Sequence, residues 1–227
     1  MKGALSRILF CMVNFMIDNR IGAIINFVRR GSKVADIGTD HGYLAIELVK
    51  SGRASFVIAT DKNSGPLDAA KKNIAAAGLS IETRLGDGLK VLREGEVDTI
   101  CIAGMGGSLI CEILNSPITN RIEQLILQPM NAAEKVCAWL KNNQWLIADV
   151  DLAEAGGIIY EIISAVKNPA EVSLQTKKTE SPLLGKFNAQ KIARLQRVLA
   201  EMSKSPAAVA TEKFTQIQAE INSLKQK

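Results

Sequence analysis

Five short strand-like runs alternate along this chain with segments of helical periodicity. The runs cover residues 33–37, 55–60, 81–85, 98–103 and 122–127. Such alternation favours parallel strands joined by right-handed helical crossovers. Two further β-like runs, 145–152 and 158–166, are joined through the sequence EAGG and predict a closing antiparallel hairpin. We therefore expect a doubly wound α/β fold with a seven-stranded sheet. Residues 17–29 have helical spacing and predict a helix before the first strand, with Asp18 as its N-cap and Gly31 as its stop.

The stretch KVADIGTDHGYL, residues 33–44, joins the first predicted strand to the next helix. A glycine turn between a strand and a helix start is a place where backbone approaches a bound ligand. The dinucleotide fingerprint GxGxxG needs only N–H donors facing a pyrophosphate. This turn instead places Asp36 and Asp40 beside Gly38 and Gly42. Because two carboxylates repel phosphate and attract a cation, the turn favours S-adenosylmethionine, which carries an ammonium and a sulfonium.

Acidic residues also follow the next two predicted strands. Asp61 could accept both hydroxyls of a ribose and would exclude a 2′-phosphate, whereas Asp87, between two glycines, could accept the exocyclic amine of adenine. Either acid alone is also explained as a helix N-cap. Ligands of open α/β sheets bind beyond the carboxyl ends of the strands. Acids at three successive strand ends therefore indicate one S-adenosylmethionine site.

The methyl acceptor is expected at the ends of the fourth and fifth strands. Residues 104–107 are glycine-rich and would let a flat ring approach closely, although a tight strand-to-helix turn is the alternative. Gln128 follows the fifth strand, and its amide could read a base edge. His41 is the single histidine, a residue type that often serves as a general base. Between Asp40 and a glycine, we expect it to shape the donor site rather than to transfer a proton.

Length and composition limit the number of domains, the role of the cysteines and the location of the protein. The chain has 227 residues, 47% hydrophobic and 22% charged, which allows one medium globular domain with an appendage. Its four cysteines lack CxxC spacing, so we expect buried reduced thiols, no metal site and a cytoplasmic location. The apolar run near the start is too short to span a bilayer and lacks a signal-cleavage site, so residues 1–16 are interpreted as an N-terminal extension.

Positive charge is concentrated at the C-terminal end. From residue 177 onward, ten lysines and arginines face four glutamates, which gives this part a net charge of +6 and the remainder −1. This asymmetry is expected of an enzyme with an added nucleic-acid grip, and a merely solvated basic face is the alternative. The predicted phosphate-binding residues are Lys177, Lys178, Lys186, Lys191, Arg194 and Arg197.

The same part of the chain contains an apolar seam at helical spacing. Its members are Ile192, Leu195, Leu199, Met202 and, beyond Pro206, Phe214, Ile217, Ile221 and Leu224. Two such amphipathic helices predict an antiparallel helical hairpin, with packing against the main domain as the alternative. The expected domains are 17–167 for the α/β domain and 168–227 for a polar linker followed by the basic helices.

Four motifs in order and spacing resemble the bacterial TrmK family: DIGTDHGYL at 36–44, GDGL at 86–89, IAGMGG at 102–107 and LQP at 127–129. Members of that family are tRNA (adenine-N1)-methyltransferases acting on adenine 22 of the D-arm. The resemblance implies a class I methyltransferase domain with a Rossmann-like sheet, followed by a small coiled-coil-like helical domain. It also implies S-adenosylmethionine as the methyl donor and tRNA as the partner; we expect a monomer without membrane association.

The resemblance, taken with the strand ends, assigns candidate residues. Donor binding falls to Asp36, Gly38, Asp40, His41, Asp61, Asp87, Gly88 and Gly104. The acceptor would face Gly106, Gly107 and Gln128, with Asp40 and Gln128 as candidate catalytic groups. The chain departs from the family at Met130, where Asn is usual, and at Ala45, where Pro is frequent.

Methylation of adenine at N1 makes modest chemical demands. The neutral ring nitrogen carries a lone pair, so in-line transfer needs no strong base, and alignment in a dry pocket could contribute at most about 7–11 kcal/mol. Asp40 could favour the positive charge that develops on the ring. A paired adenine must first be exposed, at a cost of a few kcal/mol. The alternatives are methyl transfer to another RNA or a small molecule, and a non-catalytic RNA-binding protein with a vestigial donor pocket.

Overall fold

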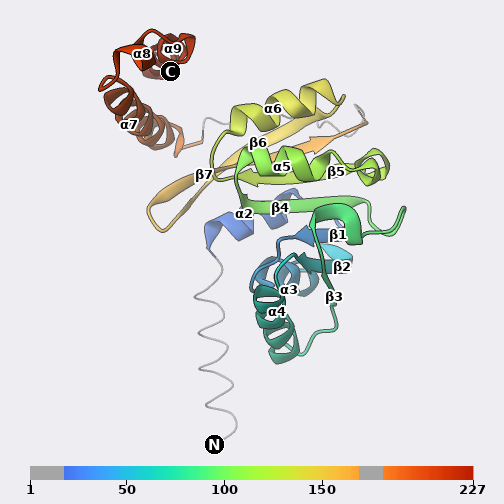
Figure 1. The fold of residues 1–227 in the computed structure, drawn as a ribbon. Coiled ribbons are helices and arrows are strands. Elements are labelled where there is room, and N and C mark those ends of the chain that lie inside the picture. Colours follow the sequence, from blue (N-terminus) through green and yellow to red (C-terminus); the bar gives the residue numbers. More distant parts are fainter. Residues whose placement is uncertain (1–17, 169–180, 227) are drawn as a thin grey trace, which may run out of the picture. The chain divides into compact units, whose positions relative to one another are not determined.

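The computed structural model describes residues 18–168 and 181–226 (Figure 1). Predictions for the N-terminal extension, for Cys11, Lys177 and Lys178, and for most of the polar linker lie outside this part. The described residues form two compact units. The larger unit runs to Ala155 and resumes at Tyr160, while Gly156–Ile159 group with the C-terminal helices in the smaller unit.

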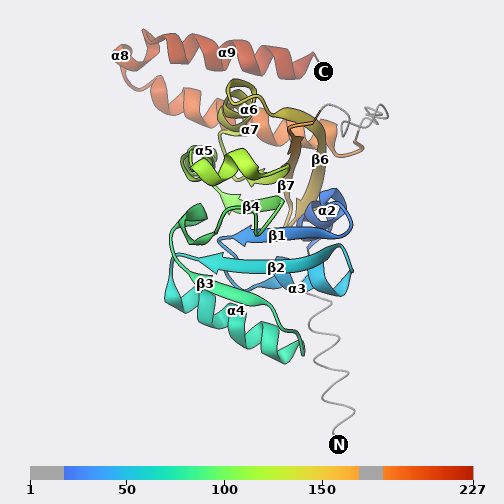
Figure 2. The same cartoon turned by 90° about the vertical axis from the view of Figure 1, so that its right-hand side faces the viewer.

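The sheet has seven strands in the order β3-β2-β1-β4-β5-β7-β6 (Figure 2). Their bounds are β1 Ser32–Ile37, β2 Ala54–Asp61, β3 Glu82–Leu85, β4 Thr99–Met105, β5 Gln124–Pro129, β6 Leu146–Ala155 and β7 Ile158–Val166. β1 pairs in parallel with β2 and β4, whereas β5 pairs antiparallel with β7. The doubly wound sheet with an antiparallel closing hairpin is therefore confirmed.

Helices cover both faces of this sheet. They are α2 Asn19–Phe27, α3 Tyr43–Lys50, α4 Ser64–Ala76, α5 Gly107–Leu114 and α6 Ala133–Asn142, with short 3₁₀ helices η1 Gly88–Val91 and η2 Pro117–Arg121. Successive residues of β1 point to opposite faces. Ala35 and Ile37 join the apolar cluster beneath α5 and α6, and Val34 joins the cluster beneath α2 and α3. Because both faces are covered, most residues of β1, β2, β4 and β5 are buried, whereas the edge strand β3 has no buried residue.

The helix before β1 shows how local sequence and packing share control of the boundaries. Asp18 caps it as predicted, because its carboxylate accepts a hydrogen bond from the backbone N–H of Ile21 at 3.0 Å. The helix ends at Phe27, however, and not at Gly31. Val28 is extended and fully buried, so core packing ends the helix before the glycine is reached.

The smaller unit contains α7 Leu184–Met202, α8 Pro206–Val209 and α9 Glu212–Lys225. α7 and α9 lie side by side and run in opposite directions (Figure 2). Their contact is an apolar cluster of Ile192, Leu195, Leu199, Met202, Ile217, Ile221 and Leu224. The helical hairpin is confirmed, with α8 as an unpredicted connection and Phe214 outside the seam. No helix in the described ranges is long and apolar enough to cross a membrane.

Candidate functional site

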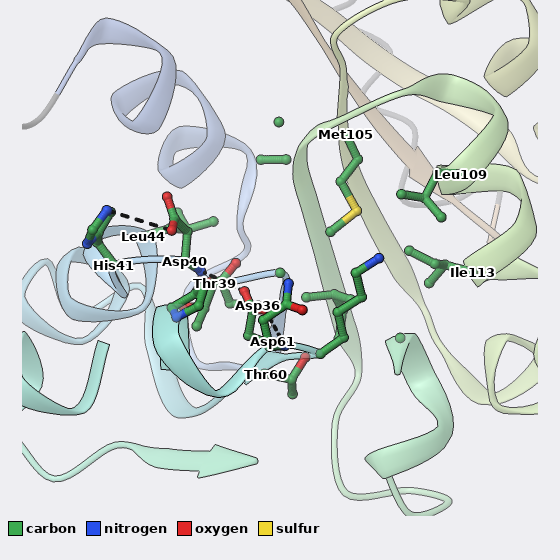
Figure 3. Close-up of a pocket in the computed structure, with 18 of the residues that line it drawn as sticks. Asp36, Thr39, Asp40, His41, Leu44, Thr60, Asp61, Met105, Leu109 and Ile113 are labelled. Carbon is green, nitrogen blue, oxygen red and sulfur yellow. Dashed lines mark hydrogen bonds and ion pairs between the residues drawn. The ribbon is translucent and has the colours of Figure 1, made fainter. Parts of the chain in front are cut away.

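The carboxyl ends of the parallel strands border a cavity of about 570 Å³ (Figure 3). This volume lies within the usual range for small-molecule sites. Its walls come from the turn after β1, the end of β2, the loop after β3, the end of β4 and the start of α2. The cavity therefore lies where the sequence placed the donor, beyond the strand ends.

The turn after β1 is fixed against the end of β2. The backbone N–H groups of Gly38 and Thr39 donate to the carbonyl of Thr60 at 2.9 and 2.8 Å. Gly38 has a φ of +73°, and a Cβ there would lie 2.1 Å from the Cε of Met105. A side chain at this position would thus be both strained and obstructed. The turn brings Asp40 to the cavity wall in a left-handed conformation, with φ at +52°.

Asp36 lies at the base of the cavity and is only 3% exposed. Its Oδ2 accepts a hydrogen bond from the Thr39 hydroxyl at 2.7 Å. Burial raises the pKa of Asp36 to about 6, since the Thr39 hydrogen bond offsets only part of the desolvation and the charge of Asp61 adds to the rise. A cation bound nearby would favour the ionised form of this carboxyl.

Asp61, 7% exposed, joins two loops of the site. One carboxylate oxygen accepts the backbone N–H of Asp40 at 3.2 Å, and the other accepts that of Asn63 at 2.9 Å. Each oxygen of an ionised carboxylate can accept a second hydrogen bond. Asp61 therefore holds the turn after β1 to the start of α4 and keeps acceptor capacity for two hydroxyls of a ligand.

Asp87 differs from the other acids because it is exposed and paired. Lys90 lies 2.5 Å from it, and this hydrogen-bonded contact lowers the pKa of Asp87, with a further contribution from the charge of Lys62. A Cβ on Gly86 would lie 2.1 Å from Val91, which accounts for the glycine before the acid. The loop therefore lies against protein and presents an ionised carboxylate at its surface.

Apolar side chains form the wall opposite the acids. Met105, Leu109 and Ile113 lie across the cavity from Asp36 and Asp61 in Figure 3. A Cβ on Gly88 would lie 3.3 Å from Ile113, so the loop after β3 approaches this wall closely. Such an apolar wall beside a carboxylate can pack against a flat heteroaromatic ring.

His41 lies at the mouth of the cavity. Its Nε2 is 3.7 Å from the Asp40 carboxylate, and its ring stacks on Tyr43 with centroids 5.7 Å apart. The side chain of Asn73 donates to the His41 carbonyl at 2.9 Å. The structure thus brings His41 and Asp40 together at the cavity edge, while Asp36 lies deeper.

Gly106 and Gly107 lie where the loops after β4 and β5 meet. The Gly107 N–H donates to the Asn131 carbonyl at 3.1 Å, and the Met130 N–H donates to the Met105 carbonyl at 2.8 Å. A Cβ on Gly107 would lie 2.4 Å from the carbonyl oxygen of Ala132, the residue after Asn131. Neither glycine lines the cavity, whereas Gly104 does. The tight-turn alternative accounts for this pair.

Gln128 does not face the cavity. It is fully buried, and its Oε1 accepts hydrogen bonds from Arg20 Nη1 and the Gly104 N–H, both at 3.1 Å. Its Nε2 donates to the Pro129 carbonyl at 3.0 Å. The expectation that this amide reads a base edge is not met, because its donors and acceptor are used inside the protein. Met130, 44% exposed, lines the cavity instead.

Sequence reasoning missed several lining residues. Arg20 reaches the cavity from α2, and the apolar wall comes from Met105, Leu109 and Ile113. Leu109 and Ile113 belong to the helical pattern of α5, which looks like ordinary core, and Met105 ends β4 within the glycine-rich motif, where only the glycines were considered. Arg20 stands in no motif, and only the tertiary contact with Gln128 reveals it.

The expected phosphate-binding residues of the helical unit are partly engaged. Lys191 Nζ lies 2.8 Å from Glu220 Oε1 and so joins α7 to α9. Arg197 Nε donates to the Ala193 carbonyl of its own helix at 3.4 Å. Lys186 and Arg194 also belong to α7. The four residues therefore share one helix, and Lys191 contributes to the hairpin itself.

The cysteines of the described part are free thiols. Cys101 is buried as expected, but Cys111 and Cys137 are half-exposed, which corrects that prediction for these two. Within residues 18–168 and 181–226, no three or more His, Cys, Asp or Glu side chains come together as a possible metal site.

The groups around the cavity fit S-adenosylmethionine. Carboxylates suit its positive charges and ribose hydroxyls, and the apolar wall suits its adenine. A Cβ at Gly38 or Gly86 would meet the side chain of Met105 or Val91, so these two turns are packed against protein at the edge of the cavity.

Comparisons with known proteins agree with this geometry. Residues 17–163 match the family model described as a methyltransferase domain. A Bacillus subtilis tRNA (adenine(22)-N(1))-methyltransferase is 35% identical over 185 residues, covering 77% of both chains. The crystal structure of the B. subtilis m1A22 tRNA methyltransferase TrmK superposes with a TM-score of 0.73 at 30% identity, covering 92% of this chain and 97% of that one. The structure of Mycoplasma capricolum TrmK with S-adenosylhomocysteine gives a TM-score of 0.74 at 26% identity, with 93% and 97% covered.

Proposed function

This chain belongs to the TrmK family of tRNA (adenine(22)-N(1))-methyltransferases, and we propose that it methylates N1 of adenine 22 in the D-arm of tRNA. One observation carries the proposal beyond the family relationship. Asp36, Asp61 and Asp87 lie at the carboxyl ends of three neighbouring strands and all line the same cavity. That arrangement suits a cationic nucleoside such as S-adenosylmethionine.

The proposed donor site follows the order of the strands. Asp87 with Gly88 would hold the adenine, Asp61 the ribose, and Asp36 with Asp40 the positively charged end. When bound, S-adenosylmethionine supplies a methyl group on a positive sulfur. Gly38 and Gly104 would let the backbone approach it, and His41 would cover the mouth.

The proposed acceptor site lies at the end of β4. Asp40 is exposed at the cavity wall, where its charge would favour the adenine ring as it becomes positive. Gln128 is proposed as a positioning residue, since it holds Arg20 and the Gly104 turn and makes no contact with the cavity. Gly106 and Gly107 would contribute by allowing the loops after β4 and β5 to pack closely against each other.

The helical unit is proposed as the tRNA grip. Lys186, Lys191, Arg194 and Arg197 would contact phosphates, and Lys177 and Lys178 would extend the basic surface. Phosphate contacts make binding fall steeply with salt. The division near residue 167 and the action as a monomer in the cytoplasm remain predictions.

Mass spectrometry of tRNA nucleosides tests this function. Purified enzyme is incubated with methyl-labelled S-adenosylmethionine and a tRNA transcript carrying adenine 22, beside a transcript with guanine at position 22. We expect labelled 1-methyladenosine from the first transcript only. Equal label in both transcripts would reassign the target nucleotide, and label in neither would refute the proposal.

A further inference from the structure

Two permanent cations stand among the described residues that line the cavity, Arg20 and Lys62. The charge of Lys62 acts on Asp87, beyond β3. Arg20 lies beside Gly104 and Gln128, which belong to β4 and β5. Because β3 and β4 flank β2 and β1 in the sheet, the two cations mark opposite ends of the site.

Arg20 is held in place by three separate elements. Its Nη1 donates to Gln128 at the end of β5 at 3.1 Å. Its guanidinium carbon lies 5.4 Å from the centre of the Tyr160 ring on β7. Its Nε is 3.5 Å from the carboxylate of Asp18, the residue that caps α2. A long side chain fixed from three directions is preorganised for a contact.

These contacts leave Arg20 with a largely unneutralised charge and with N–H donors available to a ligand. The side chains of Arg20 and Asp18 are 26% and 36% exposed, and an ion pair of that kind is weak. The Nε is enclosed and forms no hydrogen bond within the described part of the chain. Gln128 uses one of five guanidinium N–H donors. A Cβ on Gly104 would lie 3.6 Å from Nη1, so the guanidinium borders the cavity at that glycine.

A donor that spans the cavity brings one anionic group to this end. With adenine at Asp87 and ribose at Asp61, the amino-acid part of S-adenosylmethionine extends past β1 towards β4. That part carries an α-carboxylate, which the acids of the site would repel. We propose that Arg20 binds this carboxylate of the donor through its guanidinium. Paired N–H groups of arginine match two carboxylate oxygens.

This inference rests on the donor site of the proposed function but not on its RNA substrate. A phosphate of the bound tRNA is the other anion that could meet Arg20. The donor carboxylate is favoured because Arg20 borders Gly104, which lines the same cavity as the three acids. The two sources are separable, since one interaction needs no RNA.

Calorimetry without RNA tests the proposal. The ligands are S-adenosylmethionine and its decarboxylated analogue, which differs only by the missing carboxylate, and the proteins are the wild type and Arg20→Met. We expect Arg20→Met to weaken S-adenosylmethionine binding by about 10- to 100-fold, as for loss of a charge-assisted pair. The analogue should bind both proteins within about threefold, because the interaction is already missing.

Two further variants keep the test decisive if Arg20→Met folds poorly. Arg20→Lys retains the charge and should recover part of the affinity for S-adenosylmethionine alone. Gln128→Leu leaves Arg20 charged but removes the group that holds it, so its loss should be smaller than that of Arg20→Met. Thermal unfolding of each protein reports whether the fold is intact.

The outcomes separate the two levels of inference. Equal losses for both ligands would make Arg20 a structural residue and overturn the proposal. An unchanged affinity for S-adenosylmethionine, with a salt dependence of tRNA binding reduced by about one phosphate contact, would assign Arg20 to RNA and also overturn it. Failure of the wild type to bind S-adenosylmethionine at all would instead count against the proposed function.

Discussion

The two sides of the cavity are built differently. On the side of β1, β2 and β3, carboxylates of Asp36, Asp61 and Asp87 reach the cavity directly. On the side of β4 and β5, the loops are joined by backbone hydrogen bonds and by the fully buried Gln128. Changes on the first side should alter donor affinity, whereas changes on the second should alter loop geometry and methyl transfer while leaving donor affinity mostly intact.

The largest effect is expected where the two loops touch. Gly107→Val would place a Cβ 2.4 Å from the Ala132 carbonyl and 2.8 Å from that of Asn131, and backbone cannot move aside as a side chain can. We expect a loss of about 1–3 kcal/mol in unfolding free energy, as for overpacked sites, and loss of tRNA methylation. Denaturant unfolding and a methylation assay measure the two effects.

Gly106→Ala is the matched control for this change. Its Cβ would meet only the Asn131 side chain at 3.3 Å, and its φ of −66° suits any residue. Near-normal stability is expected. If Gly106→Ala and Gly107→Val were equally destabilised, the backbone contact would not explain the glycine.

The contribution of Asp36 to donor binding can be distinguished by its pH dependence. Since burial raises the pKa of Asp36 to about 6, donor affinity should fall as pH decreases through 6, by about tenfold for each pH unit below it. Protonation removes the charge that attracts the cationic donor. Calorimetric titration from pH 8 to pH 5 measures this, and Asp36→Asn should bind weakly at every pH with a flatter profile. An identical profile in the variant would count against Asp36.

Without ligand, the free energy of unfolding should change with pH in the direction opposite to donor affinity. Between pH 4 and pH 6, the native protein retains a proton on Asp36 that the unfolded chain releases. Stability therefore decreases as pH rises through this window, and Asp36→Asn should remove that decrease, on the order of 1–3 kcal/mol. Urea unfolding at pH 4.5 and pH 7.5 checks the sign, and a variant less stable than the wild type at pH 7.5 would contradict it.

A smaller effect is expected at Gln128. Gln128→Leu leaves Arg20 and the Gly104 N–H without their acceptor, at a cost of about 1–3 kcal/mol for unsatisfied buried groups. We expect kcat to fall by about tenfold while the Kd for S-adenosylhomocysteine rises less than threefold. Single-turnover assays and calorimetry separate these quantities. A loss confined to donor affinity would break the distinction between the two sides.

The smallest effect is expected in the helical unit. Arg194→Gln should remove one phosphate contact, lowering the slope of log K for tRNA against log salt by about 0.7–0.9 and leaving donor binding unchanged. Lys213→Gln, on α9, is the comparison variant, since it makes the same charge change outside the predicted set. Equal slopes for both variants would indicate general electrostatics and no defined grip.

These differences explain what the sequence could reveal. Asp36, Asp61 and Asp87 line the cavity and could be found from the ends of predicted strands, because an acid at a strand end is visible in the sequence. Gln128 was also found as a candidate residue. The direction in which its side chain points depends on a hydrogen bond with Arg20, which is 108 positions away in the chain. Gly106 and Gly107 were read as ligand contacts because a close approach of backbone to backbone looks the same in sequence as an approach to a ligand. Tertiary contacts of this kind have no local pattern.

The prediction of helix and strand boundaries was also limited by tertiary contacts that have no local pattern. Each strand of the sheet was identified from a short run of strand-forming residues between turn signals, because such a run is a local property of the sequence. The end of α2 was misplaced because burial of Val28 overrides the helix-stopping effect of Gly31. The 3₁₀ helix that begins at Gly88 was missed because so short a segment has no periodicity to detect.

The central claim is that acids at neighbouring strand ends together hold the methyl donor. Calorimetric titration of S-adenosylhomocysteine into the wild type and Asp61→Ala, without RNA, tests it most directly. We predict one binding site per chain in the wild type and an affinity at least about 100-fold lower in the variant, because a buried carboxylate that supports both the turn and the ribose is lost. Equal affinity in the two proteins would contradict the account.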